Sequence, residues 1–327
     1  MERHHYILLG CLCLLAIASF ALSLASGSIP VSLPTLMEQW WQADGGMERD
    51  IVVELRIPRT LAAFVTGALL ALSGVVMQVL LRNPLADPYI LGVSGGAAVG
   101  ALGAILLGLG GAWVSNAAFL GAVSSIAIVF GLASLRGEWN PVRLLLTGVV
   151  VSAGWGALIN LLLATTSGNT VQSMLFWLMG DLARSRVDAG HFAVLLAGLV
   201  ILFLVARSLN ALARGEQLAA SLGVNTGRLK VLLYFTASVL TATAVTVAGS
   251  IGFVGLVIPH MLRLLGARDH RVLLPASALL GGSFLVVADG FARTIIAPQQ
   301  LPVGVVTAII GVPVFLFILH RSHRQTV

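Results

Sequence analysis

The chain of 327 residues is 58% hydrophobic and only 10% charged, and its mean hydropathy is +0.98. Soluble globular domains carry about 25% charged residues, so this composition excludes an ordinary soluble domain and indicates an integral membrane protein with several spans. The net charge of +6 is explained by basic loops on the cytoplasmic side of a membrane, and we expect no nucleic-acid partner.

Ten apolar segments follow one another along the chain, and each is continuous rather than alternating in polarity. Strands of a membrane barrel would alternate over about 10 residues. We therefore predict an all-α integral membrane protein, a bundle of about ten transmembrane helices in a single domain, 1–327. The predicted spans cover about 7–25, 60–81, 90–108, 115–135, 143–165, 191–206, 229–249, 251–264, 272–295 and 303–320.

The distribution of basic residues predicts the orientation of the bundle. With the N-terminus inside, thirteen of the nineteen Lys and Arg residues face the cytoplasm, as the positive-inside rule requires. An even number of spans then places both termini in the cytoplasm. The six basic residues left on the outer side are Arg49, Arg56, Arg59, Arg184, Arg186 and Arg293.

Two of these outer arginines stand at the start of the second segment, in the sequence RIPRT (56–60). Two interpretations stay open: the side chains reach the membrane interface at a helix start, or they form a docking site for an acidic partner. Asp289 is the main acidic residue within a span, and Arg293 follows it four residues later. That spacing favours an ion pair within one helix.

The longest inner loop covers residues 207–228 and contains EQLAASLG, a short helix-forming stretch. Gly223 is placed to end this helix as a C-cap. A compact helical loop that carries Arg214, Glu216 and Arg228 suits contact with another cytoplasmic protein. An ordinary amphipathic connector is the alternative.

No motif for chemistry is found. The sequence contains no G-x-x-x-x-G-K-[ST], no H-E-x-x-H and no cysteine pair with zinc spacing. We expect no catalytic residue, no metal site and no cofactor. Acidic residues within the spans are scarce, and a gradient-driven transporter usually needs buried acids or broken-helix ion sites, so we expect the energy for transport to come from elsewhere.

Small and polar residues recur at every fourth position of the fifth segment. Such a stripe is either a helix–helix contact or the wall of a substrate passage. As a passage wall it would gain weak polar contacts in its outer half from Thr165, Thr166 and Ser167. The stripe itself consists of Gly148, Ser152, Gly156 and Asn160.

Glycines also punctuate the eighth segment, where Gly249, Gly252 and Gly255 precede Pro259. This pattern predicts a bent or interrupted helix. Residues 255–274 are moreover weakly similar to residues 74–92, as after an ancient duplication.

Three long motifs allow the sequence to be compared with a specific protein family. They are RIPRTLAAFVTGALLALSGVVMQVLLRNPLADPYILGVSGGA (56–97), GSIGFVGLVIPHMLRLLGARDHRVLLPASALLGG (249–282) and LPVGVVTAIIGVPVF (301–315). Together they closely resemble the permeases of type II ABC importers, the uptake family for vitamin B12, ferric siderophores and haem. The resemblance covers nearly the whole chain.

This resemblance implies a homodimer in a bacterial inner membrane, with a translocation path along its two-fold axis. Two cytoplasmic ATP-binding subunits and an outer substrate-binding protein are the implied partners, besides the lipid bilayer. Arginines that match Arg56, Arg59 and Arg293 meet glutamates on the binding protein in relatives. The residues of the implied coupling helix, which sits on the ATPase, are Arg214, Gly215, Glu216, Leu218, Ala219, Leu222 and Gly223.

The implied inner gate precedes the fifth segment and reads Asn140, Pro141, Val142 here. Cobalamin permeases carry small hydroxyl residues at the last two positions, so the gate departs from their pattern. Arg184 and Arg186 would contact an anionic chelate, the binding protein or only solvent.

We therefore expect a permease subunit, not an enzyme, for an ATP-driven importer of iron chelates, haem or cobalamin. An ion-gradient-driven secondary transporter is the alternative. A sensory or structural membrane scaffold is a third hypothesis, and it predicts no substrate-dependent transport.

Overall fold

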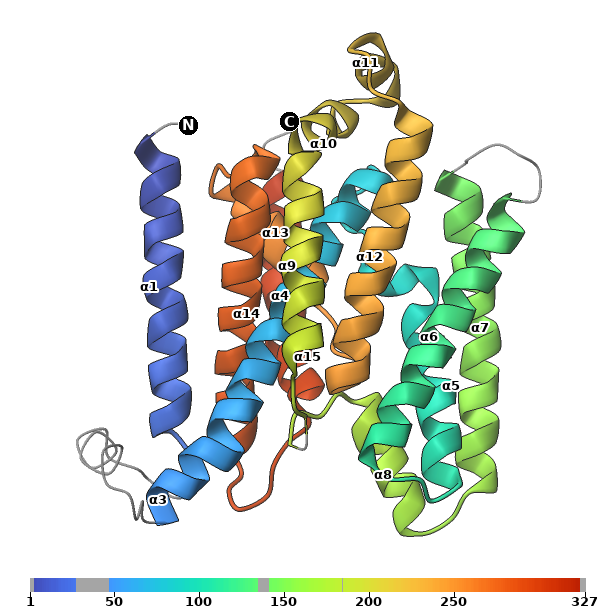
Figure 1. Cartoon of the computed structure of the whole chain (residues 1–327), viewed down its shortest axis with the longest axis vertical. Coiled ribbons are helices and arrows are strands. Elements are labelled where there is room, and N and C mark those ends of the chain that lie inside the picture. The colour runs from blue at the N-terminus through green and yellow to red at the C-terminus, as the bar shows by residue number, and fades with distance from the viewer. Residues whose placement is uncertain (1–2, 28–46, 135–140, 184, 324–327) are drawn as a thin grey trace.

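The structure is a computed structural model, and it describes residues 3–27, 47–134, 141–183 and 185–323. These residues form helices joined by turns and short loops, with no β-strand among them (Figure 1), which confirms the predicted all-α fold. The helices are α1 (Arg3–Ala25), α3 (Met47–Asp50), the π-helical turn η1 (Ile51–Arg56), α4 (Ile57–Leu80), the 3-10 turn η2 (Pro88–Leu91), α5 (Val93–Leu106), α6 (Gly111–Ser134), α7 (Pro141–Thr165), α8 (Asn169–Leu178), α9 (Ala189–Leu204), α10 (Ala206–Ala213), α11 (Glu216–Ser221), α12 (Thr226–Ala248), α13 (Val254–Leu264), α14 (His270–Thr294) and α15 (Val303–His323).

Six helical stretches within the described residues are long and apolar enough to cross a membrane by themselves. They are His4–Ala25, Ile51–Leu80, Gly111–Ala133, Val142–Thr165, Thr226–Ala248 and His270–Thr294. The pair α9 and α10 passes the same test together, but its two helices are bent by 63° at the break between them. Shorter apolar helices are α5, α13 and residues 303–317 of α15.

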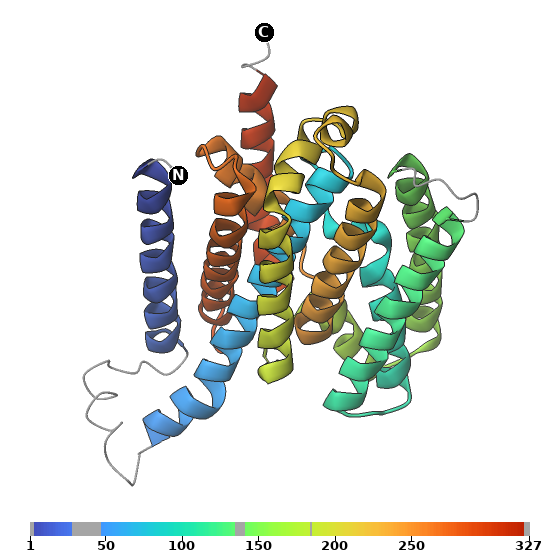
Figure 2. The same cartoon turned by 45° about the horizontal axis from the view of Figure 1, so that its top comes forward.

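The two ends of the bundle are named after helices that mark them. At the α11 end, α1 begins and α10 and α11 project from the bundle, while α3 and α8 lie at the opposite α3 end (Figure 1). The turned view shows that α15 also finishes at the α11 end (Figure 2).

Helix α4 forms the centre of the bundle and is almost entirely buried. It packs against α12, α13 and α14. The approach is close enough that a Cβ at Gly74 would overlap the carbonyl oxygen of Gly255, and one at Gly67 would overlap that of Gly281. Small residues at such crossings let two helix backbones come into contact. This close packing holds membrane helices together, because lipid is as apolar as their side chains and the hydrophobic effect does not drive their association.

The remaining helices surround this centre in two ways. Helix α1 packs mainly against α14 and leaves most of its apolar side chains exposed. Helices α5, α6 and α7 form a second group on the other side, with α8 beside their α3-end tips (Figure 1). Helix α7 is the most exposed of the long helices, so much of its apolar surface is open to lipid or to another protein.

The predicted interruption of the eighth segment is confirmed. Helix α12 ends at Ala248, α13 begins at Val254, and Phe253 between them has φ +70°, a left-handed conformation that is rare for a bulky residue. Pro259 has no backbone N–H to donate to the Gly255 carbonyl one turn earlier. The Gln78 amide on α4 donates to the carbonyl oxygens of Gly255, at 3.3 Å, and Leu256, at 3.1 Å.

Candidate functional site

The RIPRT motif builds a charged cluster at the α3 end. Pro58 stands in the first turn of α4, which directly continues the π-helical turn η1, and Arg56 and Arg59 lie on either side of it in the sequence. These arginines are three residues apart and share one face of the helix. That face is turned toward α14 and α1.

Arg59 binds Asp289 on α14 through two nitrogens. Its Nε donates to Oδ1 at 3.0 Å and to Oδ2 at 2.9 Å, and Nη2 donates to Oδ1 at 2.8 Å. Its remaining nitrogen, Nη1, donates to Gln300 Oε1 at 2.7 Å. Asp289 is only 1% exposed and Arg59 only 8%, so this is a buried ion pair.

Arg293 completes the pairing of Asp289. Its Nε lies 3.2 Å from Asp289 Oδ2, which confirms the predicted ion pair between positions four apart. Its Nη2 donates to the hydroxyl of Ser23 on α1 at 2.8 Å. The Ser23 hydroxyl is also 2.8 Å from that of Thr60 on α4, so the cluster joins three helices.

Arg56 is the third arginine, and its Nη1 donates to the Leu24 carbonyl oxygen at 2.5 Å. We call Arg56, Arg59, Arg293 and Asp289 the arginine cluster. It consists of three guanidinium groups and one carboxylate. The structure brings the three expected arginines together but turns them inward, and docking to a binding protein stays a prediction.

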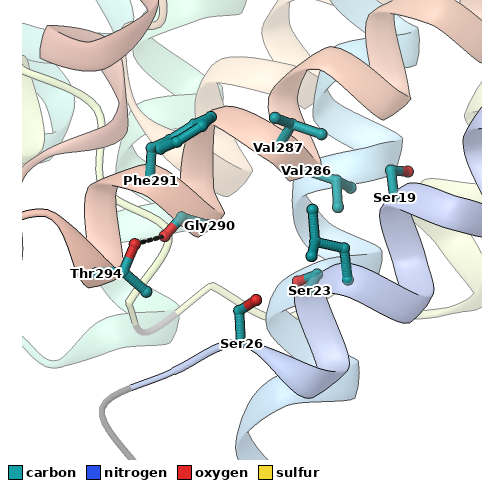
Figure 3. A pocket seen from close by; sticks show the side chains of 9 residues that line it. Ser19, Ser23, Ser26, Val286, Val287, Gly290, Phe291 and Thr294 are labelled. Atoms are coloured by element: carbon teal, nitrogen blue, oxygen red, sulfur yellow. Dashed lines mark hydrogen bonds between the residues drawn. The ribbon is translucent and has the colours of Figure 1, made fainter.

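A cavity of about 180 Å³ lies beside the arginine cluster, between α1 and α14 (Figure 3). The Ser19 hydroxyl donates to the Ala16 carbonyl and that of Thr294 to the Gly290 carbonyl, so these groups are satisfied within their own helices. The cavity therefore offers a mostly apolar wall rather than charge. It is lined by Ser19, Leu22, Ser23, Ser26, Val286, Val287, Gly290, Phe291 and Thr294.

The inner loop forms a compact projection at the α11 end. Helix α11 ends as predicted: Gly223 has φ +82°, and the N–H groups of Gly223 and Val224 donate back to the carbonyls of Ala220 and Ala219. Ala219 faces inward and is fully buried. Leu218 and Leu222, four residues apart, are 43% and 65% exposed. An apolar face of α11 is therefore open.

Helix α11 is tied to α12 by an ion pair. Lys230 Nζ donates to Glu216 Oε1 at 2.5 Å, and the lysine side chain is buried. This hydrogen bond is the main reason why the pKa of Glu216 lies below its ordinary value. The neighbouring Arg214 is exposed, and Gly215 forms the sharp turn between α10 and α11 with φ +133°.

Helix α10 is tied to α14 by a second polar contact that sequence reasoning missed. Asn210 Nδ2 donates to Asp269 Oδ1 at 2.8 Å, and Asn210 Oδ1 accepts from the backbone N–H of His270 at 3.0 Å. The Asp269 carboxylate also caps α14 by accepting from Arg271 N at 2.9 Å. An aspartate directly before an apolar run signals such a cap, but nothing in the sequence signals the asparagine partner.

The predicted passage stripe on α7 divides into two parts. Gly148 packs against Ile90 of η2, and Ser152 lies close to Gly92 at the start of α5, so this half is a helix contact. A Cβ at Gly156 would meet open space, and Asn160 is exposed. The hydroxyls of Thr165 and Thr166 donate to carbonyls of their own helix.

The predicted gate is described in part. Asn140 lies outside the described residues, Pro141 is the first residue of α7, and the Val142 side chain is exposed. Arg184 also lies outside them, and the Arg186 side chain is exposed. In the described part of the chain, no group of His, Cys, Asp or Glu side chains could hold a metal ion.

The chain is similar to known permeases. The model of the FecCD transport family matches residues 14–321. The chain is 46% identical to the cobalamin import system permease protein BtuC of Halobacterium salinarum, over 82% of this chain and 73% of that protein. It is 37% identical to the hemin transport system permease protein HmuU of Yersinia pestis, over 98% and 97%.

A solved structure agrees with these relatives. It is an inward-facing ABC transporter assigned to the metal-chelate type, it is 33% identical to this chain, and the TM-score is 0.85 over 96% of this chain and 98% of that chain. Because the family model and the relatives cover most of the sequence, the chain belongs to the FecCD transport family and is a permease of the type II ABC importers.

Proposed function

We propose that the chain is the membrane-spanning subunit of an ATP-driven importer for iron chelates, as ferric siderophore or haem, or for cobalamin. The observation that carries the proposal is the open Leu218–Leu222 face of α11 in a chain that matches the family over residues 14–321. An exposed apolar patch rimmed by polar residues is typical of a protein interface. The substrate class follows the names of the relatives, which transport cobalamin and hemin.

In this proposal the chain crosses the bacterial inner membrane ten times, with both termini and the α11 end in the cytoplasm. The six long helices, the bent pair of α9 and α10, and the three shorter apolar helices would make up the ten crossings. Burial of α13 inside the bundle supports this count, because a short or broken span is tolerated where protein surrounds its backbone.

Two ATP-binding subunits would sit on α11 of two copies of this chain. The substrate-binding protein would dock at the α3 end, where the guanidinium groups of the arginine cluster would attract an acidic partner. Such charges set encounter rate and register more than affinity. Because the guanidinium groups are turned inward, they would act through their field rather than by projecting from the surface.

The passage would run along the axis between the two copies. The exposed half of α7, with Gly156 and Asn160, supports a wall of low polarity. A weakly polar wall suits the transfer of a large chelate, because tight binding would trap it. The chain would perform no chemistry and would change its access as ATP binding closes the partner subunits.

The proposal is tested by reconstituting the chain in vesicles with its candidate ATP-binding and substrate-binding partners. Uptake of a cobalamin, haem or ferric-siderophore ligand should require ATP and both partners, and it should survive collapse of the ion gradients. Uptake without an ATP-binding partner, lost on adding an ionophore, would instead support the secondary transporter. If the complete system takes up none of these ligands, the result would favour the scaffold hypothesis.

A further inference from the structure

We infer that α14 is the mechanical link between the two partner sites, and that Asn210 is the positioning residue that attaches it to the coupling region. The inference rests on the proposed function. Its basis is that α14 is held at both ends by polar contacts of different helices: by Asn210 of α10 at one end and by Arg59 of α4 at the other.

The contact at the α11 end is formed by Asn210, Asp269 and His270, which we call the α10–α14 latch. His270 is 3% exposed, and its Nδ1 lies 2.7 Å from Asn210 Oδ1. Asn210 thus accepts from both the backbone and the ring of His270 while its amide donates to Asp269. Both ends of one amide are used, and this fixes its orientation.

The contact at the α3 end is the ion pair of Asp289 with Arg59 of α4, and Arg293 of α14 pairs with the same carboxylate. One continuous helix of 25 residues joins the two contacts, and at 1.5 Å per residue it spans about 37 Å. The glycine crossing between Gly67 and Gly281 presses α14 against α4 midway. A shift of α10 therefore cannot be absorbed by sliding of α14 along its neighbour without breaking this packing.

Helix α11 also has the Glu216–Lys230 attachment, but that ion pair leads into α12. Helix α12 ends at the unwound residues 249–253 and contributes no residue to the arginine cluster. Helix α10 also packs against α4, but among the side-chain hydrogen bonds of the described residues only the α10–α14 latch ties the coupling region directly to a helix that carries arginine-cluster side chains. Breaking the latch should therefore uncouple ATP hydrolysis at one partner site from docking of the binding protein at the other, while leaving both sites intact.

Asn210→Asp is the informative change, because it places a carboxylate against that of Asp269 where a 2.8 Å amide hydrogen bond now lies. The exchange Asn210→Asp with Asp269→Asn restores an amide–carboxylate contact, and asparagine is as good a helix cap as aspartate. Asn225→Asp is the matched control in the same loop, where the side chain only accepts from Arg228 N.

The experiment measures ATP hydrolysis by the assembled complex in nanodiscs, with and without the ligand-loaded binding protein. Asn210→Asp should leave basal hydrolysis and the affinities for both partners near wild type but lower the stimulation by the binding protein about fivefold or more, the size of a typical coupling between sites. The double exchange should restore it, and Asn225→Asp should not change it.

Unchanged stimulation in an assembled Asn210→Asp complex would overturn the inference, as would a double exchange that assembles but stays uncoupled. If Asn210→Asp prevents assembly, Asn210→Ala removes the same hydrogen bonds without adding charge. Unchanged stimulation in the Asn210→Ala complex, or a double exchange that assembles but stays uncoupled, would then overturn the inference. Failure of the proposed function looks different: the wild-type chain itself would then bind no ATP-hydrolysing partner or show no stimulation.

Discussion

Replacing Asp289 with alanine should destabilise the protein strongly, because the change removes the only anion of the arginine cluster. Asp289 is 1% exposed, accepts three hydrogen bonds from Arg59 and pairs with Arg293 at 3.2 Å. Breaking a buried ion pair by removing one partner costs about 3–5 kcal/mol, since the other charge stays buried. Arg59 keeps Gln300 and Arg293 keeps Ser23, so we expect a loss of about 3–5 kcal/mol rather than twice that.

The loss is measured by titrating the detergent-purified chain with sodium dodecyl sulfate and following helix content. The matched control is Asp50→Ala at the same end, because Asp50 is exposed and its side chain makes no capping hydrogen bond. The control should change stability by less than about 0.5 kcal/mol. A cycle of Arg59→Gln and Asp289→Asn should give a coupling energy of about 1–3 kcal/mol. A loss below about 1 kcal/mol for Asp289→Ala would refute the reasoning.

Two further predictions concern the two ends of the bundle, and a third concerns a carboxylate in the turn before η2. Arg56→Gln should slow association of the binding protein severalfold at low salt and little at high salt, measured by surface plasmon resonance; equal rates at low salt would contradict docking through this cluster. Leu222→Asp should abolish co-purification of the ATP-binding subunit without lowering thermal stability, whereas the same change at exposed Gln217 should not; retained co-purification would place the interface elsewhere. Burial raises the pKa of Asp87, in the turn before η2, to about 6, although its hydrogen bond from Tyr89 N opposes this. The folded state therefore binds the proton more tightly than the unfolded state, and stability should fall by about 1–3 kcal/mol as pH rises from 4 to 7.5. Asp87→Asn should flatten this dependence in unfolding measurements at both pH values, and an unchanged slope would remove Asp87 as its cause.

Continuous apolar runs were enough to predict the long helices of the bundle. Helix α12 covers 226–248 where about 229–249 was expected, and α14 covers 270–294 where about 272–295 was expected. The additional helices were missed because their composition is mixed. Thus α8, beside the α3-end tips of α5 to α7, and the turns that precede α4 carry polar residues among apolar ones and show no long apolar stretch.

The candidate site was predictable only where its contacts are local. The pairing of Asp289 with Arg293 follows from a spacing of four residues on one helix. The pairing of Asp289 with Arg59 joins residues 230 positions apart, and no local pattern encodes it. For the same reason the sequence placed the arginines on the outer side but could not reveal that they turn inward, or that Asn210 meets Asp269.

Gln78 has a consequence for how this transporter changes shape. Its amide donates to the Gly255 carbonyl, to which Pro259 cannot donate, and also to the Leu256 carbonyl. Its carbonyl oxygen accepts from Arg263, and it lies one turn from the Gly74–Gly255 crossing. These contacts join the two chain segments whose sequences are weakly similar. Moving α13 away from α4 would leave the Gly255 carbonyl without a hydrogen-bond partner in a medium that contains no water. We therefore expect α4 and α13 to stay packed together through the proposed transport cycle, so that opening and closing come from parts that pivot around this pair.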